Sequence, residues 1–326
     1  MLSFKSDLNE SGKGNAPAFR CPSCNSESLR WRGAIPDAYE FAGQVLENPL
    51  PGGDLFGCKD CALCFRSPIQ GPEVYDRLYA SGKSEPWDAF AARIDHRLAA
   101  AAIMSATPSG DVLDIGCGAG GLLSLLPVSY RKYGVELGEQ ARCLAASRGV
   151  EIICDSFRSL HQIDRRFDIV VATDVIEHHP QPGVLLDNCL RLLKPGGHLI
   201  VSSGAADAPL WRISGGKYWY CQFAEHLTFV SAKWFERVCA NRYEIKEVER
   251  FSYVQRDVQS RLKGLILTVI YLCSDRLYES LATRRLAQNR STEPITPPLP
   301  PGIGLFRDHI LVTLLKRVPG SVSKPT

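Results

Sequence analysis

The chain has 326 residues, of which 45% are hydrophobic and 22% charged, an ordinary balance for a globular protein with room for one large domain or two smaller ones. A formal net charge of +3 is too small to indicate nucleic acid as an obligatory partner. The longest apolar run, Gly264–Cys273, is about half the ~20 residues that a membrane span requires. The first residues lack the apolar segment of a signal peptide, which favours a cytoplasmic location.

Cysteines cluster near the beginning of the chain. Cys21 and Cys24 form one C-x-x-C pair, and FGCKDCALCF contains Cys58, Cys61 and Cys64 at three-residue intervals. In a reducing compartment such pairs indicate metal more than disulfides, and two pairs supply the four thiolates of a structural zinc site. Free or redox-active thiols and an iron–sulfur cluster are the competing interpretations. The spacing alone leaves open which two of the triplet are used.

The chain then divides into regions of different character. Residues 1–18 read as a disordered tail, 19–70 as the cysteine module and 71–110 as a helical lead-in, with helices over 72–80 and 86–106. From Asp111 short apolar strands alternate with helices, which indicates a parallel sheet covered on both faces. The predicted strands are 111–115, 132–136, 151–154, 167–173, 198–202, 243–254 and 308–317, with helices over 120–126, 138–148, 182–193 and from Ser231.

The first of these strands runs into glycines, in the stretch DVLDIGCGAGG over 111–121. Glycines let the backbone turn tightly and approach a ligand, and the following helix directs its N-terminal amides at that ligand. The strand ends in Asp114, which suits a ligand with a positive charge. The next strand ends in Glu136, where a carboxylate can accept both hydroxyls of a ribose.

Taken in order, DIGCGAGG, Glu136, FDIVVATDVIEHH and LKPGG resemble the class I S-adenosylmethionine-dependent methyltransferases. A different nucleotide-binding domain of the Rossmann type is the alternative. The resemblance implies an α/β fold, with a Rossmann-like class I methyltransferase sheet, an N-terminal zinc ribbon and a helical insertion before the last strand. It implies S-adenosylmethionine and structural zinc as cofactors. It also selects Cys58 and Cys61 as the second pair, with Cys64 as a buried thiol, and Ala62 offers the small residue expected after such a pair.

The resemblance also assigns cofactor contacts. The methionine part would lie against the glycine loop, the ribose on the acid of the second strand, the adenine beyond the third strand and the sulfonium by the end of the fourth. The residues so implied are Asp114, Gly116, Cys117, Gly118, Glu136, Asp155, Ser156, Thr173 and Asp174.

Two histidines are the candidate catalytic bases, because an acceptor that carries a hydroxyl or amine must lose a proton. His178 follows the fourth strand, and His226 lies in GGKYWYCQFAEHLTFVS. Orienting loops and capping helices are their alternative roles. In two branches of the family a similar acid-x-x-Glu-His pattern binds a divalent metal, so Asp174, Glu177 and His178, with His226, are also a candidate second metal site.

The aromatic residues of the same stretch, Trp219, Tyr220 and Phe223, are either a stacking wall for an acceptor or a cover for the core. Residues 255–305 read as a helical and then Pro-rich insertion that caps the site, between methyltransferase segments 111–254 and 306–318. Its basic face over 256–290 is solvated, makes peripheral contact with an anionic membrane or steers a phosphate-bearing substrate.

Together these features predict an enzyme that methylates a hydroxyl, amine or carbon of a small-molecule or sugar-type acceptor, such as a nucleotide sugar, a glycolipid or a natural-product intermediate. The acceptor would be held by the 211–230 loop and the cap. The alternatives are an RNA methyltransferase that uses its zinc ribbon on RNA, which the mild charge disfavours, and a non-catalytic scaffold.

Overall fold

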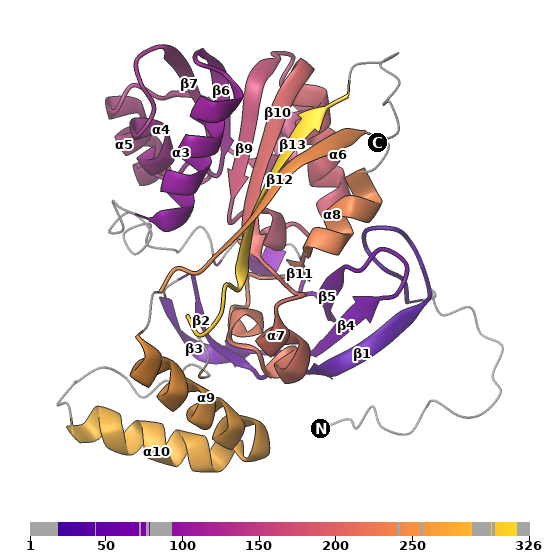
Figure 1. Ribbon diagram of the computed structural model, residues 1–326, viewed down its shortest axis with the longest axis vertical. Helices are drawn as coiled ribbons and strands as arrows, with labels where there is room; N and C mark the ends of the chain where they lie inside the picture. The colour runs from indigo at the N-terminus through magenta and orange to yellow at the C-terminus, as the bar shows by residue number, and fades with distance from the viewer. Residues whose placement is uncertain are drawn as a thin grey trace.

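A seven-stranded sheet forms the centre of the molecule (Figure 1). The computed structural model describes residues 19–42, 44–71, 73–75, 78, 93–239, 242–254, 257–288, 301 and 304–317. The predicted tail over 1–18 lies outside these residues, as do most of the predicted helix over 72–80, the beginning of that over 86–106 and nearly all of the Pro-rich stretch.

The seven strands of the central sheet are mostly parallel. In spatial order they are β12 (Tyr243–Phe251), β13 (His309–Lys316), β10 (Leu193–Gly204), β9 (Phe167–Thr173), β6 (Gly110–Ile115), β7 (Tyr130–Val135) and β8 (Glu151–Cys154). The central strands are parallel and β13 is antiparallel to both its neighbours. Because β6, β9 and β10 are buried on both faces, each contains a short apolar run, such as IVVA in β9 and LIV in β10.

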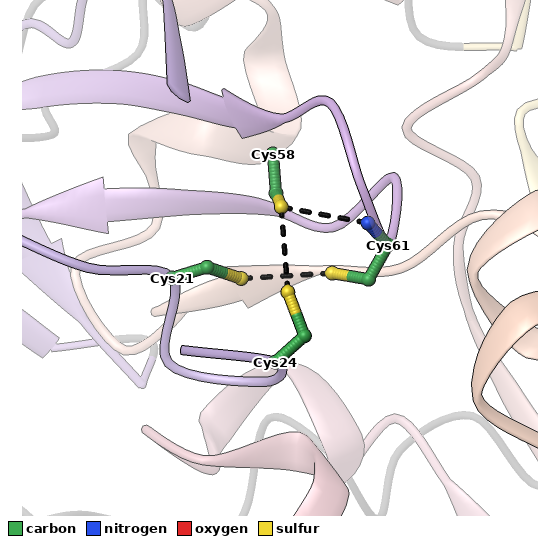
Figure 2. Close-up of side chains that lie close together, drawn as sticks. All are labelled: Cys21, Cys24, Cys58 and Cys61. Atoms are coloured by element: carbon green, nitrogen blue, oxygen red, sulfur yellow. Dashed lines mark hydrogen bonds between the residues drawn. The ribbon is translucent and has the colours of Figure 1, made fainter. Parts of the chain in front are cut away.

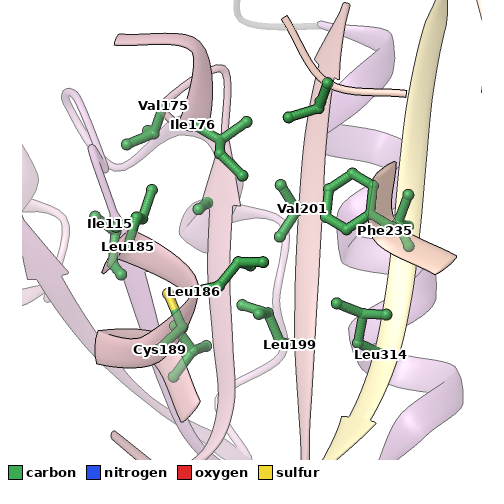
Figure 3. Close-up of a cluster of buried hydrophobic side chains, with 14 of the residues drawn as sticks. Ile115, Val175, Ile176, Leu185, Leu186, Cys189, Leu199, Val201, Phe235 and Leu314 are labelled. Carbon is green, nitrogen blue, oxygen red and sulfur yellow. The ribbon is translucent and has the colours of Figure 1, made fainter. Parts of the chain in front are cut away.

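Helices cover the two faces of this sheet. On one face lie α3 (Ile94–Ala106), α4 (Gly121–Ser124) and α5 (Glu139–Ser147), whose buried residues pack with Val112, Ile169 and Ile200. On the other face lie α6 (Pro182–Leu192) and α8 (Ala232–Cys239). Figure 3 shows their side chains against the strands, with Leu185, Leu186 and Phe235 in contact with the core. This is the predicted α/β fold.

The cysteine module forms a second, smaller sheet. Its strands are β1 (Leu29–Ala34), β4 (Asp54–Cys58), β5 (Cys64–Ser67) and β11 (Thr228–Phe229), in that order, and we call it the ribbon sheet. A hairpin of β2 (Ala38–Phe41) and β3 (Gln44–Leu50) lies beside it. Since β11 comes from the long connection after β10, the ribbon sheet is built partly from the methyltransferase-like half. The ribbon sheet therefore includes a strand from outside the predicted cysteine module over 19–70.

Short helical turns and a helical hairpin complete the chain. The turns are α7 (Pro209–Ser214), η1 (Phe157–Gln162), η2 (Ile176–His178), η3 (Gly215–Lys217) and η4 (Trp219–Gln222). The hairpin of α9 (Val258–Cys273) and α10 (Asp275–Gln288) extends away from the central sheet (Figure 1). Among the described helices, none combines the length and apolarity needed to cross a membrane.

Candidate functional site

Most of the predicted cofactor residues lie at the carboxyl edge of the central sheet. Asp114 belongs to the end of β6, Glu136 follows β7, Asp155 follows β8, and Thr173 ends β9. Because these four strands are parallel and adjacent, their carboxyl ends meet along one edge, which is where open α/β sheets bind ligands. The local sequence predicted each position, and the strand order brings them together.

The glycine loop has a backbone that other residues would strain. Gly116 has φ +75°, and a Cβ added there would lie 2.7 Å from Cγ2 of Val175. Gly118 and Gly120 have φ values of +51° and +80°. The amides of Gly116 and Cys117 donate to the carbonyl of Val135 at 2.8 and 3.1 Å, which fixes the loop against β7. The loop is thus preformed for close approach of a ligand.

The two carboxylates beside this loop differ in the hydrogen bonds that they accept. Glu136 accepts hydrogen bonds from the amides of Gly118 and Gly138, at 2.9 and 2.7 Å. Asp114 is 2% exposed, and its Oδ1 has no hydrogen-bond partner among the described residues. Burial and the nearby Glu136 raise the pKa of Asp114 to about 8. A buried, unsatisfied carboxyl of this kind fits the ammonium group of S-adenosylmethionine.

Three other predicted cofactor residues lie in different surroundings. Cys117 is buried, and its Sγ packs so closely on Gly134 that an added Cβ there would lie 2.6 Å away. Ser156 caps η1 by accepting from the amide of Arg158 at 3.2 Å. Asp155 is exposed beyond β8. Cys117 therefore has a packing role, while Asp155 is free of the core.

Asp174 is held by two residues that sequence reasoning missed. Its Oδ2 accepts from the guanidinium of Arg93 and from the hydroxyl of Tyr253, the latter at 2.6 Å. Arg93 also donates to Asp95, which ties the beginning of α3 to the end of β9. Asp174 has φ +51°, a backbone conformation that non-glycine residues adopt rarely and often at functional sites. No local motif marks Arg93 or Tyr253, since both contacts are long-range.

The two candidate bases lie side by side. The ring centroids of His178 and His226 are 5.1 Å apart. Nδ1 of His178 lies 3.1 Å from the carbonyl of Glu225, and Nδ1 of His226 lies 3.0 Å from the carbonyl of Tyr220. A carbonyl only accepts, so each Nδ1 carries the proton and each Nε2 presents a lone pair. Burial lowers the pKa of both histidines, which keeps them neutral.

Glu177 lies close to this pair and is fully buried. It accepts from the hydroxyl of Tyr220 and, at 3.0 Å, from the hydroxyl of Ser203. Burial and the nearby Asp174 raise the pKa of Glu177 to about 8. Its backbone carbonyl accepts from the amide of Leu227 at 2.7 Å. Glu177 thus connects the end of β9 to the segment that carries His226.

The aromatic residues after β10 mostly cover a core. Trp219 and Tyr220 are buried with Trp211 and Tyr218, whereas Phe223 is only partly buried against them. Of the three, Phe223 is thus the one that this core leaves partly exposed. Capping of the helix from Ser231, the alternative role of His226, is performed by Ser231 itself, whose Oγ accepts from the amide of Trp234 at 3.1 Å.

The predicted second metal set is altered by the structure. Ligand atoms of Glu177, His178 and His226 lie within 4.8 Å of one another, but Asp174 is not part of this group. Its carboxylate is instead engaged by Arg93 and Tyr253. Asp174, the first acid of the predicted acid-x-x-Glu-His pattern, therefore has a different role from the metal ligand that the pattern suggested.

Four of the N-terminal cysteines form one cluster (Figure 2). The Sγ atoms of Cys21 and Cys61, and those of Cys24 and Cys58, are each 3.5 Å apart, and all four lie within 4.8 Å. Zinc–thiolate bonds of about 2.3 Å place tetrahedral sulfurs about 3.8 Å apart. The donor set therefore fits a zinc ion, and Cys64, buried in β5, is outside it.

Both cysteine pairs have the same backbone geometry. The residues after each pair, Asn25 and Ala62, have φ +61° and +65°. Their amides donate to the carbonyls of Cys21 and Cys58, at 2.9 and 3.1 Å. A small or asparagine side chain tolerates this left-handed conformation, which explains the preference for one after the second cysteine. Each pair is a tight turn that presents two sulfurs.

Arg66 joins the ribbon sheet to the segment that carries His226. Arg66 is 2% exposed, and its guanidinium donates to four carbonyls. The acceptors are Gly52, Cys221, Phe223 and His226, at 3.0, 2.5, 2.9 and 3.2 Å. The sequence analysis assigned no role to Arg66. An arginine in an otherwise apolar strand was the available signal.

Part of the chain matches known proteins. Residues 88–242 match the model of a methyltransferase domain. The chain is 33% identical over 117 residues to a ubiquinone biosynthesis O-methyltransferase of Coxiella burnetii, covering 33% of this chain and 50% of that protein. The corresponding enzyme of Proteus mirabilis is 31% identical over 109 residues, 31% of this chain and 44% of its own. The chain thus spans about half the length of the curated relatives it matches.

Among solved structures, a Burkholderia thailandensis 1,6-didemethyltoxoflavin-N1-methyltransferase is similar at 15% identity and a TM-score of 0.48. The match covers 78% of this chain and 95% of that one. The family model, the strand order with its antiparallel β13 and the preformed glycine loop agree with one another. By these features, residues 88–242 of the chain form a methyltransferase domain.

Proposed function

We propose that the protein transfers a methyl group to a hydroxyl of a small-molecule acceptor. The observation that carries this proposal is the pairing of His178 and His226 at the carboxyl edge of the sheet, each with its Nδ1 on a backbone carbonyl. S-adenosylmethionine, when bound, supplies an electrophilic methyl group. The names of the ubiquinone-pathway relatives support a hydroxyl over an amine or carbon.

We propose the following roles for residues of the chain in this reaction. Asp114 would bind the ammonium group and Glu136 the ribose hydroxyls of the cofactor, with Gly116 and Gly118 allowing close approach. A histidine Nε2 would accept the proton of the acceptor hydroxyl, which requires the neutral imidazole that burial favours. The buried Glu225, beside His178, would stabilise the resulting imidazolium.

The test is methyl transfer from radiolabelled S-adenosylmethionine to a panel of phenols, prenylated phenols, sugar nucleotides and RNA. We expect a hydroxyl-bearing small molecule to be labelled, and His178→Gln and His226→Gln to lower the rate. His161→Gln, at an exposed histidine of η1, is the matched control. Labelling of RNA alone would contradict the proposal, and absence of cofactor binding in calorimetry would indicate a scaffold.

Zinc in the cysteine cluster would be structural, because four thiolates leave no open position. A second ion is the alternative to a histidine base. Glu177, His178 and His226 offer a carboxylate and two neutral imidazoles within 4.8 Å, a donor set that suits a divalent transition metal. Elemental analysis separates the two: one metal per chain supports the base, and two metals of which one is lost in His226→Gln support the second ion.

We further propose that α9 contacts an anionic membrane. Val258, Leu262, Leu265, Ile266 and Val269 are exposed, and their spacing places them on one face of the helix. Arg261 and Lys263 are exposed on either side of that stripe. Apolar residues flanked by basic ones are typical of helices that lie in a membrane surface. A lipid-linked acceptor would then be delivered from that surface.

Sedimentation with vesicles tests this contact. Phosphatidylglycerol vesicles should retain the protein better than phosphatidylcholine vesicles do. Because burying one leucine contributes about 1.5–3 kcal/mol, Leu262→Ser should weaken partitioning by about tenfold or more. Leu144→Ser, at an exposed leucine of α5, is the control. Equal partitioning of both variants would refute a membrane role for α9.

A further inference from the structure

Three arginines from two separate elements line one groove. Arg30 and Arg32 of β1 and Arg212 of α7 line it, together with Pro209 and Ile213. Its volume is about 450 Å³, within the range of small-molecule sites. None of the residues discussed above for cofactor, acceptor or zinc lies in its lining.

The groove is held open by close backbone packing between two segments. A Cβ on Gly215 would lie 1.9 Å from the carbonyl oxygen of Arg32, and one on Gly216 would lie 2.5 Å from that of Ala34. Nη2 of Arg32 donates to the carbonyl of Arg212 at 3.3 Å. The pairing of β1 with β4 is irregular at Arg32, between Trp31 and Gly33. Such bulges re-aim side chains and recur beside functional sites.

The charges in the groove are uncompensated. Among the described residues, no ion pair involves Arg30, Arg32 or Arg212, and no carboxylate belongs to the lining. Like charges gathered at one site repel one another, so the arrangement favours an anion that is bound between them. The guanidinium fork matches phosphate oxygens in particular.

We propose that this groove binds the diphosphate of a soluble phosphate ester. Three positive charges match a diphosphate better than a single carboxylate. Ile213, which is 72% exposed, and Pro209 provide an apolar rim for the organic part of such a ligand. This site does not depend on the proposed methyl transfer, and its test does not measure that reaction.

The test is calorimetric titration of the full chain with inorganic pyrophosphate and, separately, with uridine diphosphate. We expect about one equivalent of pyrophosphate to bind. Arg30→Gln, Arg32→Gln and Arg212→Gln should each weaken binding about tenfold, because each removes charge-assisted hydrogen bonds. The triple variant should lose binding. Arg166→Gln, at an exposed arginine before β9, makes the same charge change elsewhere and should bind as the wild type does.

Two further measurements separate a loss of binding from misfolding and from loss of charge. Circular dichroism of each variant shows that it is folded, and Arg30→Lys, which keeps the charge but loses the fork, should bind with intermediate affinity. Failure of the wild type to bind pyrophosphate, or an equal loss in Arg166→Gln, would overturn the proposal. Arginine-dependent binding to phosphatidic acid vesicles without any binding of pyrophosphate would identify a lipid headgroup instead and would also overturn it.

Discussion

Replacing Arg66 with methionine should destabilise the protein by about 3–5 kcal/mol. The guanidinium is buried and makes four hydrogen bonds to carbonyls of Gly52, Cys221, Phe223 and His226. Each such bond contributes about 1 kcal/mol, and more where the donor is charged. The relief of a buried cation's desolvation offsets part of this loss, which gives the stated range.

Arg66→Lys separates charge from geometry. A lysine keeps the positive charge, but a single nitrogen cannot reach four carbonyls that surround a planar guanidinium. We therefore expect Arg66→Lys to be at least as destabilised as Arg66→Met. If the charge were the important property, the lysine variant would instead be close to the wild type.

The assay is urea denaturation of the zinc-loaded protein, followed by tryptophan fluorescence. Arg166→Met, at an exposed arginine, should stay within about 0.5 kcal/mol of the wild type. Hydrogen exchange of the amides over 221–227 should accelerate in Arg66→Met, because these residues lose their anchor to the ribbon sheet. A loss below about 1 kcal/mol, with unchanged exchange in this segment, would refute the reasoning.

Three other predictions concern the cofactor, the metal and the base. Asp114→Asn should weaken S-adenosylmethionine binding about tenfold in calorimetry. The affinity of the wild type should rise with pH up to about 8, because the raised pKa of Asp114 leaves a proton on its carboxyl that must be released before an ammonium can bind. An affinity of the wild type that does not change with pH would contradict this. By elemental analysis, Cys61→Ser should lose zinc and Cys64→Ser should keep it; the reverse result would change the ligand assignment. His226→Gln should lower kcat by about 10²–10⁴-fold with unchanged cofactor affinity, whereas an effect on KM alone would assign His226 to acceptor binding.

The sequence by itself predicted the features that depend on residues close together in the chain. The apolar runs of β6, β9 and β10 reflect burial on both faces of a parallel sheet, so they could be read directly. The cysteine pairs could also be predicted from the local sequence. A turn that presents two sulfurs needs a fixed spacing and a residue such as Ala62 that accepts positive φ. The acids after successive strands could be placed together once the strands were taken as parallel.

The tertiary structure alone decided how these parts are connected. β11 pairs with β5 across the chain, and Arg66 then reaches the carbonyl of His226, 160 positions away. Arg93 and Tyr253 bind Asp174 across separations of 81 and 79 residues, which removes Asp174 from the predicted metal set. Contacts between distant residues leave no periodicity or spacing in the sequence. The motifs therefore specified the chemistry of each group, and the fold determined which of these groups meet.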